Sequence, residues 1–392
     1  MKPLRTPVTF LATSLILGMT VAACSSGSSG GPSASNAGGT AKGPIKFGVL
    51  DALTGSAASF GTREVAAVKA VVEETNAKGG INGRKIQLIV KDTKTDPNTA
   101  VRQASSLIGD GVIGIFGSAT GSTTLSYINA TMKAEIPVIP PVSTAEVTDP
   151  SKPYTRWVFR PGPKPGADVD VMLKKAATNG ARRIGVLYQE DAYGTSEYKL
   201  AKKDASKFNV RVVGSASAAS DAVDVTSQMT RILKSNPDAI FTFTSPPPLT
   251  GAALRTAQKD GFKGPIYGVE GSVQLATIKA AQGHANTYHA PAMINPSDLS
   301  TMPKLTRLMK GHGGVSGFAE LLGADGMGFV VEALKQSGAT TGTELRDALT
   351  KIRGFKAYGN IPWTFGENKH DGFPDSAFFW VHVKDGKFVN DN

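Results

Sequence analysis

The chain has 392 residues, of which 40% are hydrophobic and 19% are charged, and its formal net charge is +11. This length accommodates two domains with cores of their own, and the ordinary apolar content excludes a disordered chain. The lysines and arginines are scattered rather than clustered, which argues against a nucleic-acid-binding protein. A single cysteine excludes an intrachain disulfide, so each domain depends on its hydrophobic core.

The first 23 residues carry the pattern of an export signal. Lys2 and Arg5 form a short basic segment, and the mostly apolar run that follows has the length of a signal-peptide core rather than of a membrane span. The run ends in Val21-Ala22-Ala23-Cys24, which resembles the lipobox of bacterial lipoproteins, where cleavage before the cysteine is coupled to its acylation. We therefore expect lipid attachment at Cys24 and an extracytoplasmic location. The alternative is an ordinary secretory signal that ends near a cysteine.

Residues 24–44 consist almost entirely of Ser, Gly, Ala, Asn, Thr and Pro. Such a composition cannot bury apolar surface, which predicts a flexible tether. Cleavage would remove Lys2 and Arg5 and lower the net charge from +11 to +9. No later run approaches the 18 or more apolar residues of a membrane helix, so the lipid would be the only membrane attachment.

Strands and helices alternate through the first part of the folded chain. We expect strands over 45–50, 85–90, 111–116 and 136–139. The first helix carries Val65, Val68 and Val72 at helical spacing and stops at Gly79-Gly80. A second helix follows the Asp96-Pro97 cap to about residue 109, and a third covers 122–134. The β-α-β-α-β-α-β order predicts a doubly wound parallel sheet with helices on both faces.

The alternation restarts after Phe159-Arg160-Pro161-Gly162-Pro163. Expected helices at 167–178, 194–208, 225–234 and 251–260 alternate with strands at 183–187, 210–214, 239–243 and 265–268. From about residue 290 the chain turns helical, over 305–310, 318–336 and 343–352, and a hairpin around Asp385-Gly386 closes it. We therefore expect two α/β lobes with a ligand cleft beyond the carboxyl ends of their strands.

Several short sequence motifs follow one another along residues 45–392. They are Gly48–Gly55 with Phe60-Gly61, Asn76–Gly83 with Asp92 and Asp96-Pro97, Gly117–Thr124, Pro141–Thr144, Tyr193-Gly194 and Gly268–Gly271. Together they resemble type I periplasmic binding proteins of the branched-chain amino-acid family. The resemblance implies two Rossmann-like, doubly wound parallel-sheet lobes joined by three hinge crossings. It assigns 45–160 plus 290–358 to the first lobe and 161–289 plus 359–392 to the second. It also implies a monomer that delivers a solute to the permease subunits of an ABC importer, with a ligand-sensing subunit as the alternative.

The loop from Gly117 to Thr124 lies between a strand and a helix N-terminus, so its free N–H groups and the helix dipole suit a carboxylate. Hydroxyl groups of Thr120, Ser122, Ser143 and Thr144 could add hydrogen bonds to such a ligand, unless Ser122 or Thr123 merely caps the helix. Relatives commonly carry serine where this chain has Gly121, so any contact there would come from its N–H group.

Glu270 follows a buried strand between small residues and matches the family carboxylate that pairs with an α-ammonium group. A carboxylate in a water-poor cleft is costly unless a cation neutralises it, which favours an amino-bearing ligand over a solvated loop glutamate. Phe60 and Tyr193 are expected as aromatic walls, one from each lobe, unless they belong to the cores. The stiff Pro246-Pro247-Pro248 segment departs from the family pattern, so amides, urea and aromatic acids stay alternative ligands.

The sequence carries no catalytic constellation. Its five histidines show no metal-ligand spacing, and no H-E-x-x-H, G-x-S-x-G, Walker or G-x-G-x-x-G pattern occurs in the folded part. Acylation of Cys24 would also remove a thiol nucleophile. We therefore expect a binding protein without a cofactor or metal, and an exported hydrolase is the alternative from another class.

Overall fold

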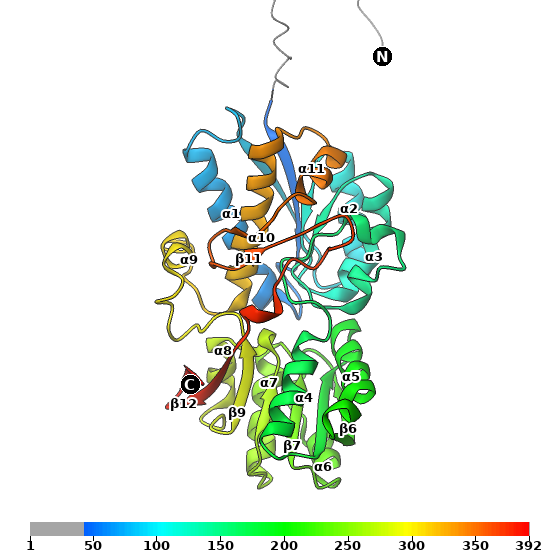
Figure 1. Cartoon of the computed structure of the whole chain (residues 1–392), viewed down its shortest axis with the longest axis vertical. Coiled ribbons are helices and arrows are strands. Elements are labelled where there is room, and N and C mark those ends of the chain that lie inside the picture. The colour runs from blue at the N-terminus through cyan, green and yellow to red at the C-terminus, as the bar shows by residue number, and fades with distance from the viewer. Residues whose placement is uncertain (1–42, 392) are drawn as a thin grey trace, which may run out of the picture. The chain divides into compact units, whose positions relative to one another are not determined.

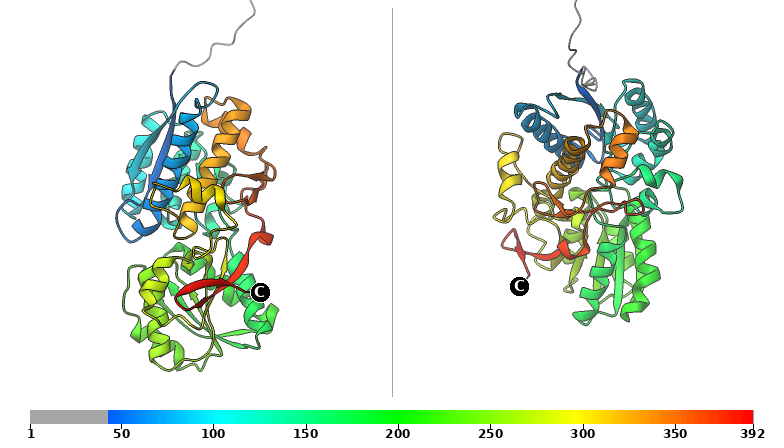
Figure 2. Two further views of the ribbon diagram at one scale, coloured as in Figure 1. Left: turned by 90° about the vertical axis from the view of Figure 1, so that its left-hand side faces the viewer. Right: turned by 45° about the horizontal axis from the view of Figure 1, so that its top comes forward.

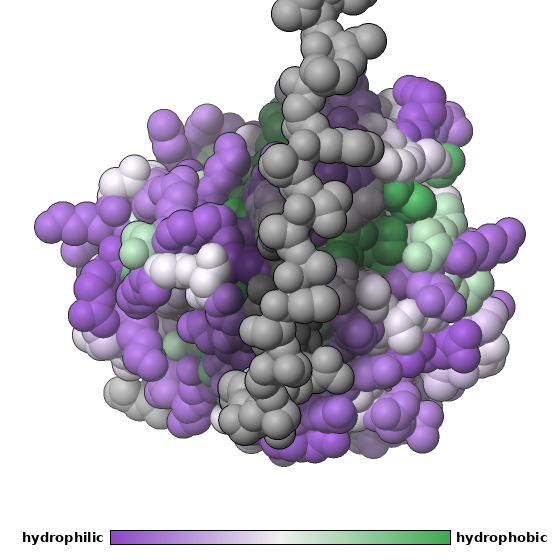
Figure 3. All heavy atoms as spheres, turned by 90° about the horizontal axis from the view of Figure 1, so that it is seen from above, coloured by the Kyte–Doolittle hydropathy of each residue, from purple (hydrophilic) through white to green (hydrophobic). Residues whose placement is uncertain are grey.

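A computed structural model describes residues 43–391, so the predicted signal peptide, Cys24 and nearly all of the tether lie outside the described residues. This part of the chain contains two large sheets, each with helices on both faces (Figure 1). Most side chains on the face shown in Figure 3 are hydrophilic. Over residues 43–391, no helix combines the length and apolar character needed to cross a membrane.

The first sheet is parallel and has the strand order β2-β1-β3-β4. Its strands are β1 (Ile45–Asp51), β2 (Ile86–Asp92), β3 (Ile115–Phe116) and β4 (Val138–Ile139). One face packs on α1 (Ala58–Ala77), α10 (Phe318–Ser337) and α11 (Gly342–Leu349), and the other on α2 (Pro97–Gly109) and α3 (Gly121–Lys133) (Figure 1). Phe47 and Val49 point into the first of these cores and Leu50 into the second, because successive strand residues face opposite sides.

The second sheet has the order β13-β12-β9-β8-β7-β5-β6, in which β6 to β9 pair in parallel and the last two strands are antiparallel. Its strands are β5 (Arg183–Gln189), β6 (Arg211–Ala218), β7 (Ala239–Phe243), β8 (Ile266–Gly268), β9 (Tyr288–Ala292), β12 (Phe379–Lys384) and β13 (Lys387–Asn390). The β12–β13 hairpin forms an edge of this sheet and holds the C-terminus (Figure 2).

Helices cover both faces of the second sheet. The core on one face includes side chains of α4 (Ala167–Thr178) and α5 (Ala192–Asp204). The opposite core includes α6 (Thr226–Leu233), α7 (Pro247–Lys259) and α8 (Leu275–Ala281). A short helix, α9 (Pro303–Leu308), follows the return of the chain to the first lobe. The two-lobed α/β fold expected from the sequence is confirmed.

Element boundaries differ from expectation where local signals are weak. The helix at 167–178 and the strand at 239–243 coincide with their predicted ranges. By contrast, β9 occupies 288–292, where a turn to helix was expected from about residue 290, and α8 was not anticipated. The proline segment does not form a separate loop: Pro247 and Pro248 begin α7, since the first helical turn tolerates proline.

Residues 361–373 add a strip of apolar side chains to the first core, although the sequence analysis assigns 359–392 to the second lobe. Ile361, Trp363 and Phe365 all pack in that core, next to the short pair β10 (Phe355–Lys356) and β11 (Pro362–Trp363). The Trp363 Nε1–H group donates to Asp325 Oδ2 of α10 at 2.7 Å. The chain therefore returns to the second sheet later than expected. The sequence did not reveal this, because the alternation of apolar residues is too short to be recognised as a strand.

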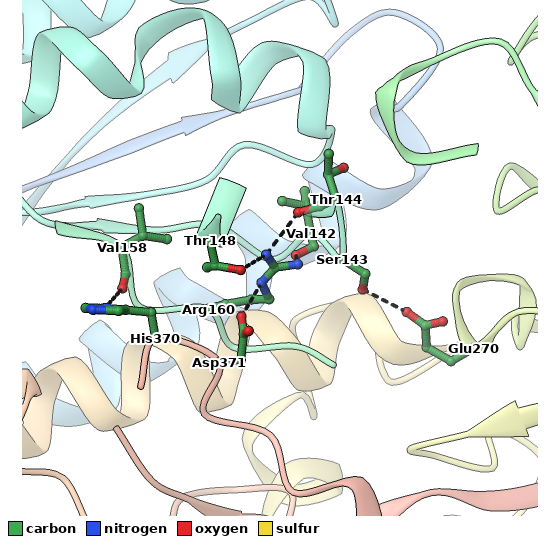
Figure 4. Close-up of polar contacts among 9 residues, drawn as sticks. All are labelled: Val142, Ser143, Thr144, Thr148, Val158, Arg160, Glu270, His370 and Asp371. Carbon is green, nitrogen blue, oxygen red and sulfur yellow. Dashed lines mark hydrogen bonds and ion pairs between the residues drawn. The ribbon is translucent and has the colours of Figure 1, made fainter. Parts of the chain in front are cut away.

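Arg160 lies fully buried where the first and third crossings between the lobes run side by side (Figure 4). Its Nη1–H donates to the Val142 carbonyl at 2.8 Å and its Nη2–H to the Thr144 carbonyl at 3.0 Å. Its Nε lies 2.9 Å from Asp371 Oδ1, and its backbone N–H donates to the His370 carbonyl. One guanidinium therefore ties two crossings to the segment that follows β4.

Replacement of Arg160 tests this anchoring role. We expect Arg160→Met to lower the free energy of unfolding by about 3–5 kcal/mol, because the carbonyl groups and Asp371 lose their buried donor. Denaturant unfolding measures the loss. Arg211→Met, at an exposed arginine on β6, is the matched control and should change stability by less than about 0.5 kcal/mol. Equal stabilities for both variants would contradict the anchoring role.

Candidate ligand-binding site

A cavity of about 240 Å³ lies between the two lobes. Its wall includes all eight residues that the sequence analysis selected: Phe60, Thr120, Gly121, Ser122, Ser143, Thr144, Tyr193 and Glu270. The first six come from the first lobe and the last two from the second. The structure therefore brings together every predicted ligand-binding residue of the folded chain.

The N-terminus of α3 forms one wall of the cavity. Thr120 caps the helix, since its Oγ1 accepts the Thr123 N–H at 3.4 Å, so the cap is neither Ser122 nor Thr123. The preceding N–H group, of Ala119, is already bound to Asp51 Oδ1 at 2.8 Å. Among the described residues, the N–H groups of Gly121 and Ser122 have no acceptor, as expected for the first turn of a helix.

Gly121 lets the neighbouring threonine approach this helix end. A Cβ atom at position 121 would overlap Thr144 Oγ1. The Thr144 side chain is fully buried, and its hydroxyl has no hydrogen-bond partner within residues 43–391. The hydroxyl that a serine would bring to position 121 is thus replaced in space by that of Thr144.

Two of the predicted hydroxyl groups bridge the lobes directly. Ser143 Oγ donates to Glu270 Oε1 at 3.3 Å (Figure 4), and Ser122 Oγ accepts the N–H of Ala192 at 3.4 Å. Ala192 is the first residue of α5, so the two helix N-termini α3 and α5 meet across the cavity. Both bonds are long, which makes them easy to exchange for other partners.

Glu270 and Tyr193 form the wall contributed by the second lobe. Glu270 begins a short 3-10 helix (Glu270–Ser272) just after β8 and is only 5% exposed. Its Oε2 accepts no hydrogen bond from an N–H or hydroxyl group of the described residues. Tyr193 is 9% exposed, and its hydroxyl likewise has no partner there. Gln189 and Ser245 lie beside them, joined by a Ser245 N–H bond to Gln189 Oε1 at 2.8 Å.

The remaining wall is apolar apart from one acid. Phe60 packs against Phe318 of α10 with ring centroids 5.6 Å apart, and Leu322 lies one turn further along that helix. Glu64 follows Phe60 by one turn of α1 and is buried beside Asp51. Burial, followed by the charge of Asp51, raises the pKa of Glu64 well above its usual range.

Charge is distributed unevenly around this cavity. Its lining contains four acidic residues, Glu64, Glu190, Asp191 and Glu270, and no lysine or arginine. Positive potential comes instead from the N–H groups at the start of α3. Over residues 43–391, no group of three His, Cys, Asp or Glu side chains could hold a metal ion.

Sequence reasoning missed buried charged residues in both lobes: Arg160, Asp51, Glu64, Asp168 and Glu197. Of these five, only Glu64 lines the cavity. A signal existed for Glu64, because it follows Phe60 at the i, i+4 spacing of one helix face, and an acid in register with an aromatic wall residue is expected to face the same cavity. Glu197 follows Tyr193 at the same spacing but does not line the cavity.

The comparisons with known proteins agree with this architecture. The Leu/Ile/Val-binding protein of Escherichia coli K12 is 28% identical over 251 residues, which cover 61% of this chain and 66% of that protein. The chain thus matches just under two thirds of the length of that relative.

Solved structures match over a larger part of the chain. An extracellular ligand-binding receptor from Rhodopseudomonas palustris HaA2 superposes with a TM-score of 0.80 at 22% identity, covering 89% of this chain and 100% of the receptor. The branched-chain amino acid transporter substrate-binding protein LivJ of Streptococcus pneumoniae, solved with isoleucine, gives 0.75 at 20% identity, covering 89% and 100%. The family model described as periplasmic binding protein matches residues 44–387. This chain therefore belongs to the periplasmic binding protein family.

Proposed function

We propose that this protein is an extracytoplasmic solute-binding protein that captures an amino acid between its lobes and delivers it to an ABC importer. The observation that carries the proposal is that two walls of opposite electrostatic potential face each other across the cavity. The N–H groups of Gly121 and Ser122 lie on one side and the buried carboxylate of Glu270 on the other. A zwitterion satisfies both walls at once.

The α3 N-terminus suits the ligand carboxylate. Two N–H groups without acceptors and the helix dipole stabilise an anion there without a lysine or arginine. The unpartnered Thr144 hydroxyl adds a third donor close to the same helix end. Asp51 accepts a hydrogen bond from the Ala119 N–H and so fixes the loop. This contact keeps the free N–H groups of Gly121 and Ser122 turned toward the cavity.

Glu270 suits the ligand ammonium group. Its carboxylate is removed from water and, among the described residues, accepts a hydrogen bond only from Ser143 across the lobes, so a cation gains a strong, poorly screened interaction there. The Tyr193 hydroxyl can turn toward either ligand group as donor or acceptor. Side-chain specificity then falls to Phe60, Phe318 and Leu322, which favour an apolar side chain.

The charges of the lining residues favour an amino acid over the alternative ligands. An aromatic acid without an amino group would place one negative charge among four acidic residues and no basic one, which is unfavourable. Amides and urea are neutral and leave the N–H groups of α3 without an anion. The named relatives support the amino-acid reading, since one is called a Leu/Ile/Val-binding protein and another was solved with isoleucine.

Closure of the lobes provides the signal for delivery. A ligand held by α3 and Glu270 binds both lobes only when they are close, so binding shifts the population toward the closed form. The closed surface would then dock on the permease subunits. A lipid on Cys24 and the following tether would keep the protein at the membrane surface. A sensory subunit would use the same closure, and genes for permeases and ATPases beside this one would favour transport.

A thermal-shift screen over amino acids, amides and aromatic acids tests the ligand class. We expect the largest rise in Tm from an apolar amino acid, because binding to the folded state stabilises it by mass action. A rise with aromatic acids or amides alone would contradict the proposal.

Glu270→Gln tests the ammonium site. We expect this nearly isosteric change to weaken L-isoleucine binding by about 2–4 kcal/mol, because a buried ammonium loses its counter-charge. Isothermal calorimetry measures the difference. Glu367→Gln, at an exposed position outside the cavity, should leave affinity unchanged. Equal affinity of wild type and Glu270→Gln would rule out the role of this carboxylate.

Small-angle scattering tests closure. Addition of a tightly bound amino acid should reduce the radius of gyration, because the lobes close around the ligand and the open population falls. Saturation of the protein with ligand at a constant radius of gyration would count against hinge closure.

A further inference from the structure

A second hollow lies on the first lobe, away from the ligand cavity. There α1 packs against α10 and α9 (Figure 2, left), and with residues 355–358 these helices enclose a groove of about 940 Å³. Val71 and Val331 are buried in its floor. Phe60 of the ligand cavity and Lys78 of the groove stand near opposite ends of α1, roughly 27 Å apart along the helix. The groove is therefore separate from the ligand site.

The acidic side chains of this groove are already partnered. Three of them line it, each beside a polar side chain: Glu73 with His312, Glu74 with Lys78 and Tyr358, and Glu332 with Gln336. Lys78 donates to Glu74 at 2.7 Å and the Tyr358 hydroxyl does so at 2.6 Å. These hydrogen bonds hold the pKa of Glu74 below its usual range, so its negative charge is spent on them.

Four basic side chains of the groove have no such partner. They come from three elements, as Lys304 and Arg307 of α9, Lys335 of α10 and Lys356 of β10. All four are exposed, and within residues 43–391 none of them makes a hydrogen bond or an ion pair. Arg307 acts on Glu74 through its charge alone. The groove thus presents more positive charge than its own acids neutralise.

This arrangement suits an anionic partner. Basic groups around one hollow repel each other, and an anionic group between them relieves that repulsion. The Arg307 guanidinium can bind two oxygens of one phosphate, and the lysines add point charges. The chain as a whole has the same bias, with 43 lysines and arginines against 32 aspartates and glutamates. A phosphate-bearing surface is therefore attracted first by the whole chain and then by the groove.

One end of the groove lies beside the point where the described chain begins. The side chain of Asn76, near the end of α1, bonds both backbone groups of Ile86 at 2.8 Å, and Arg84 Nε donates to the Gly43 carbonyl at 2.9 Å. The predicted tether, residues 24–44, leads from there to the predicted lipid. A flexible chain of about 20 residues spans roughly 25 Å. A lipid anchor would therefore keep this groove within reach of the membrane headgroups.

We propose that the groove docks the first lobe on the membrane by binding the phosphate groups of anionic lipids. The choice of a membrane over an acidic protein segment rests on the proposed function, which places the chain at a membrane surface. Docking through the groove leaves the ligand cavity uncovered, because the two share no lining residue. The first lobe is then held in one orientation while the second lobe closes.

Co-sedimentation with vesicles tests the docking. The chain from residue 24, with Cys24→Ser so that it carries no lipid, should bind vesicles of equal parts phosphatidylglycerol and phosphatidylcholine at low salt. It should not bind phosphatidylcholine alone, and salt should weaken binding because exposed charges are screened. We expect the fourfold variant Lys304→Gln, Arg307→Gln, Lys335→Gln and Lys356→Gln to lose at least about tenfold in partition coefficient.

A matched variant of the second lobe separates the groove from the net charge. Four exposed lysines there also make no hydrogen bond or ion pair among the described residues: Lys202, Lys203, Lys259 and Lys279. Their fourfold change to glutamine removes the same charge and should alter vesicle binding by less than about twofold. Equal losses in both variants would overturn the groove. Binding of the wild type to poly-L-glutamate but not to vesicles would overturn the membrane in favour of an acidic protein.

A fluorescent label checks the orientation independently. Cys24 is the only cysteine, so its serine variant can carry one label at Ala77→Cys in the groove or at Ala276→Cys on α8, both exposed positions. Vesicles with phosphatidylglycerol should raise the emission of an environment-sensitive label at 77 and not at 276. An equal response at both, or none at 77, would contradict the docking. Either failure leaves amino-acid binding intact, whereas failure of all twenty amino acids to bind would overturn only the proposed ligand.

Discussion

Negative charge buried without a matching cation is the constraint around which the cavity is organised. Glu270, with Glu190 and Asp191 of the same lobe, makes one wall acidic, and none of the lining residues is basic. The opposite wall gains positive potential only from backbone N–H groups at the start of α3. The acidic wall repels a ligand that carries only a negative charge. The opposite wall has no group that binds a ligand that carries only a positive charge. Its electrostatics are complementary to a molecule that carries both charges a few ångströms apart.

Buried polar groups away from the cavity hold these walls in place. On the first lobe, Arg160 fixes the carbonyl groups of Val142 and Thr144, and Asp51 fixes the Ala119 N–H. On the second lobe, Gln189 accepts the Ser245 N–H and donates to the Asp191 carboxylate, which caps α5. Each wall is therefore rigid within its own lobe. Binding then costs little local reordering and can act on the distance between the lobes.

The sequence predicts the fold well because long periodic elements dominate it. Helices such as 167–178 and strands such as 239–243 combine clear periodicity with clear stops, and their ranges coincide with the structure. Prediction fails where elements are short: β3 and β4 have two residues each, and the strip of Ile361, Trp363 and Phe365 is too brief to reveal which core it joins. Tertiary packing decides such segments.

The candidate site likewise contains residues that the sequence predicts and residues that it does not. Residues that follow strand ends, such as Ser143 and Glu270, could be placed in the cleft because parallel strands present their carboxyl ends to one edge. The buried acids Asp168 and Glu197 could not be assigned to the interior, because hydropathy places a lone acid in a helix in solvent. Only three-dimensional packing shows that both side chains are buried.

Affinity for three matched ligands tests the central claim most directly. L-Leucine carries both charges, 3-methylbutylamine lacks its carboxylate, and 4-methylpentanoate lacks its ammonium group. The account predicts that leucine binds at least about 100-fold more tightly than either analogue in calorimetry, since each lost charge leaves one wall unsatisfied. Binding of 4-methylpentanoate as tight as that of leucine would contradict it, because Glu270 would then have no ligand group to neutralise.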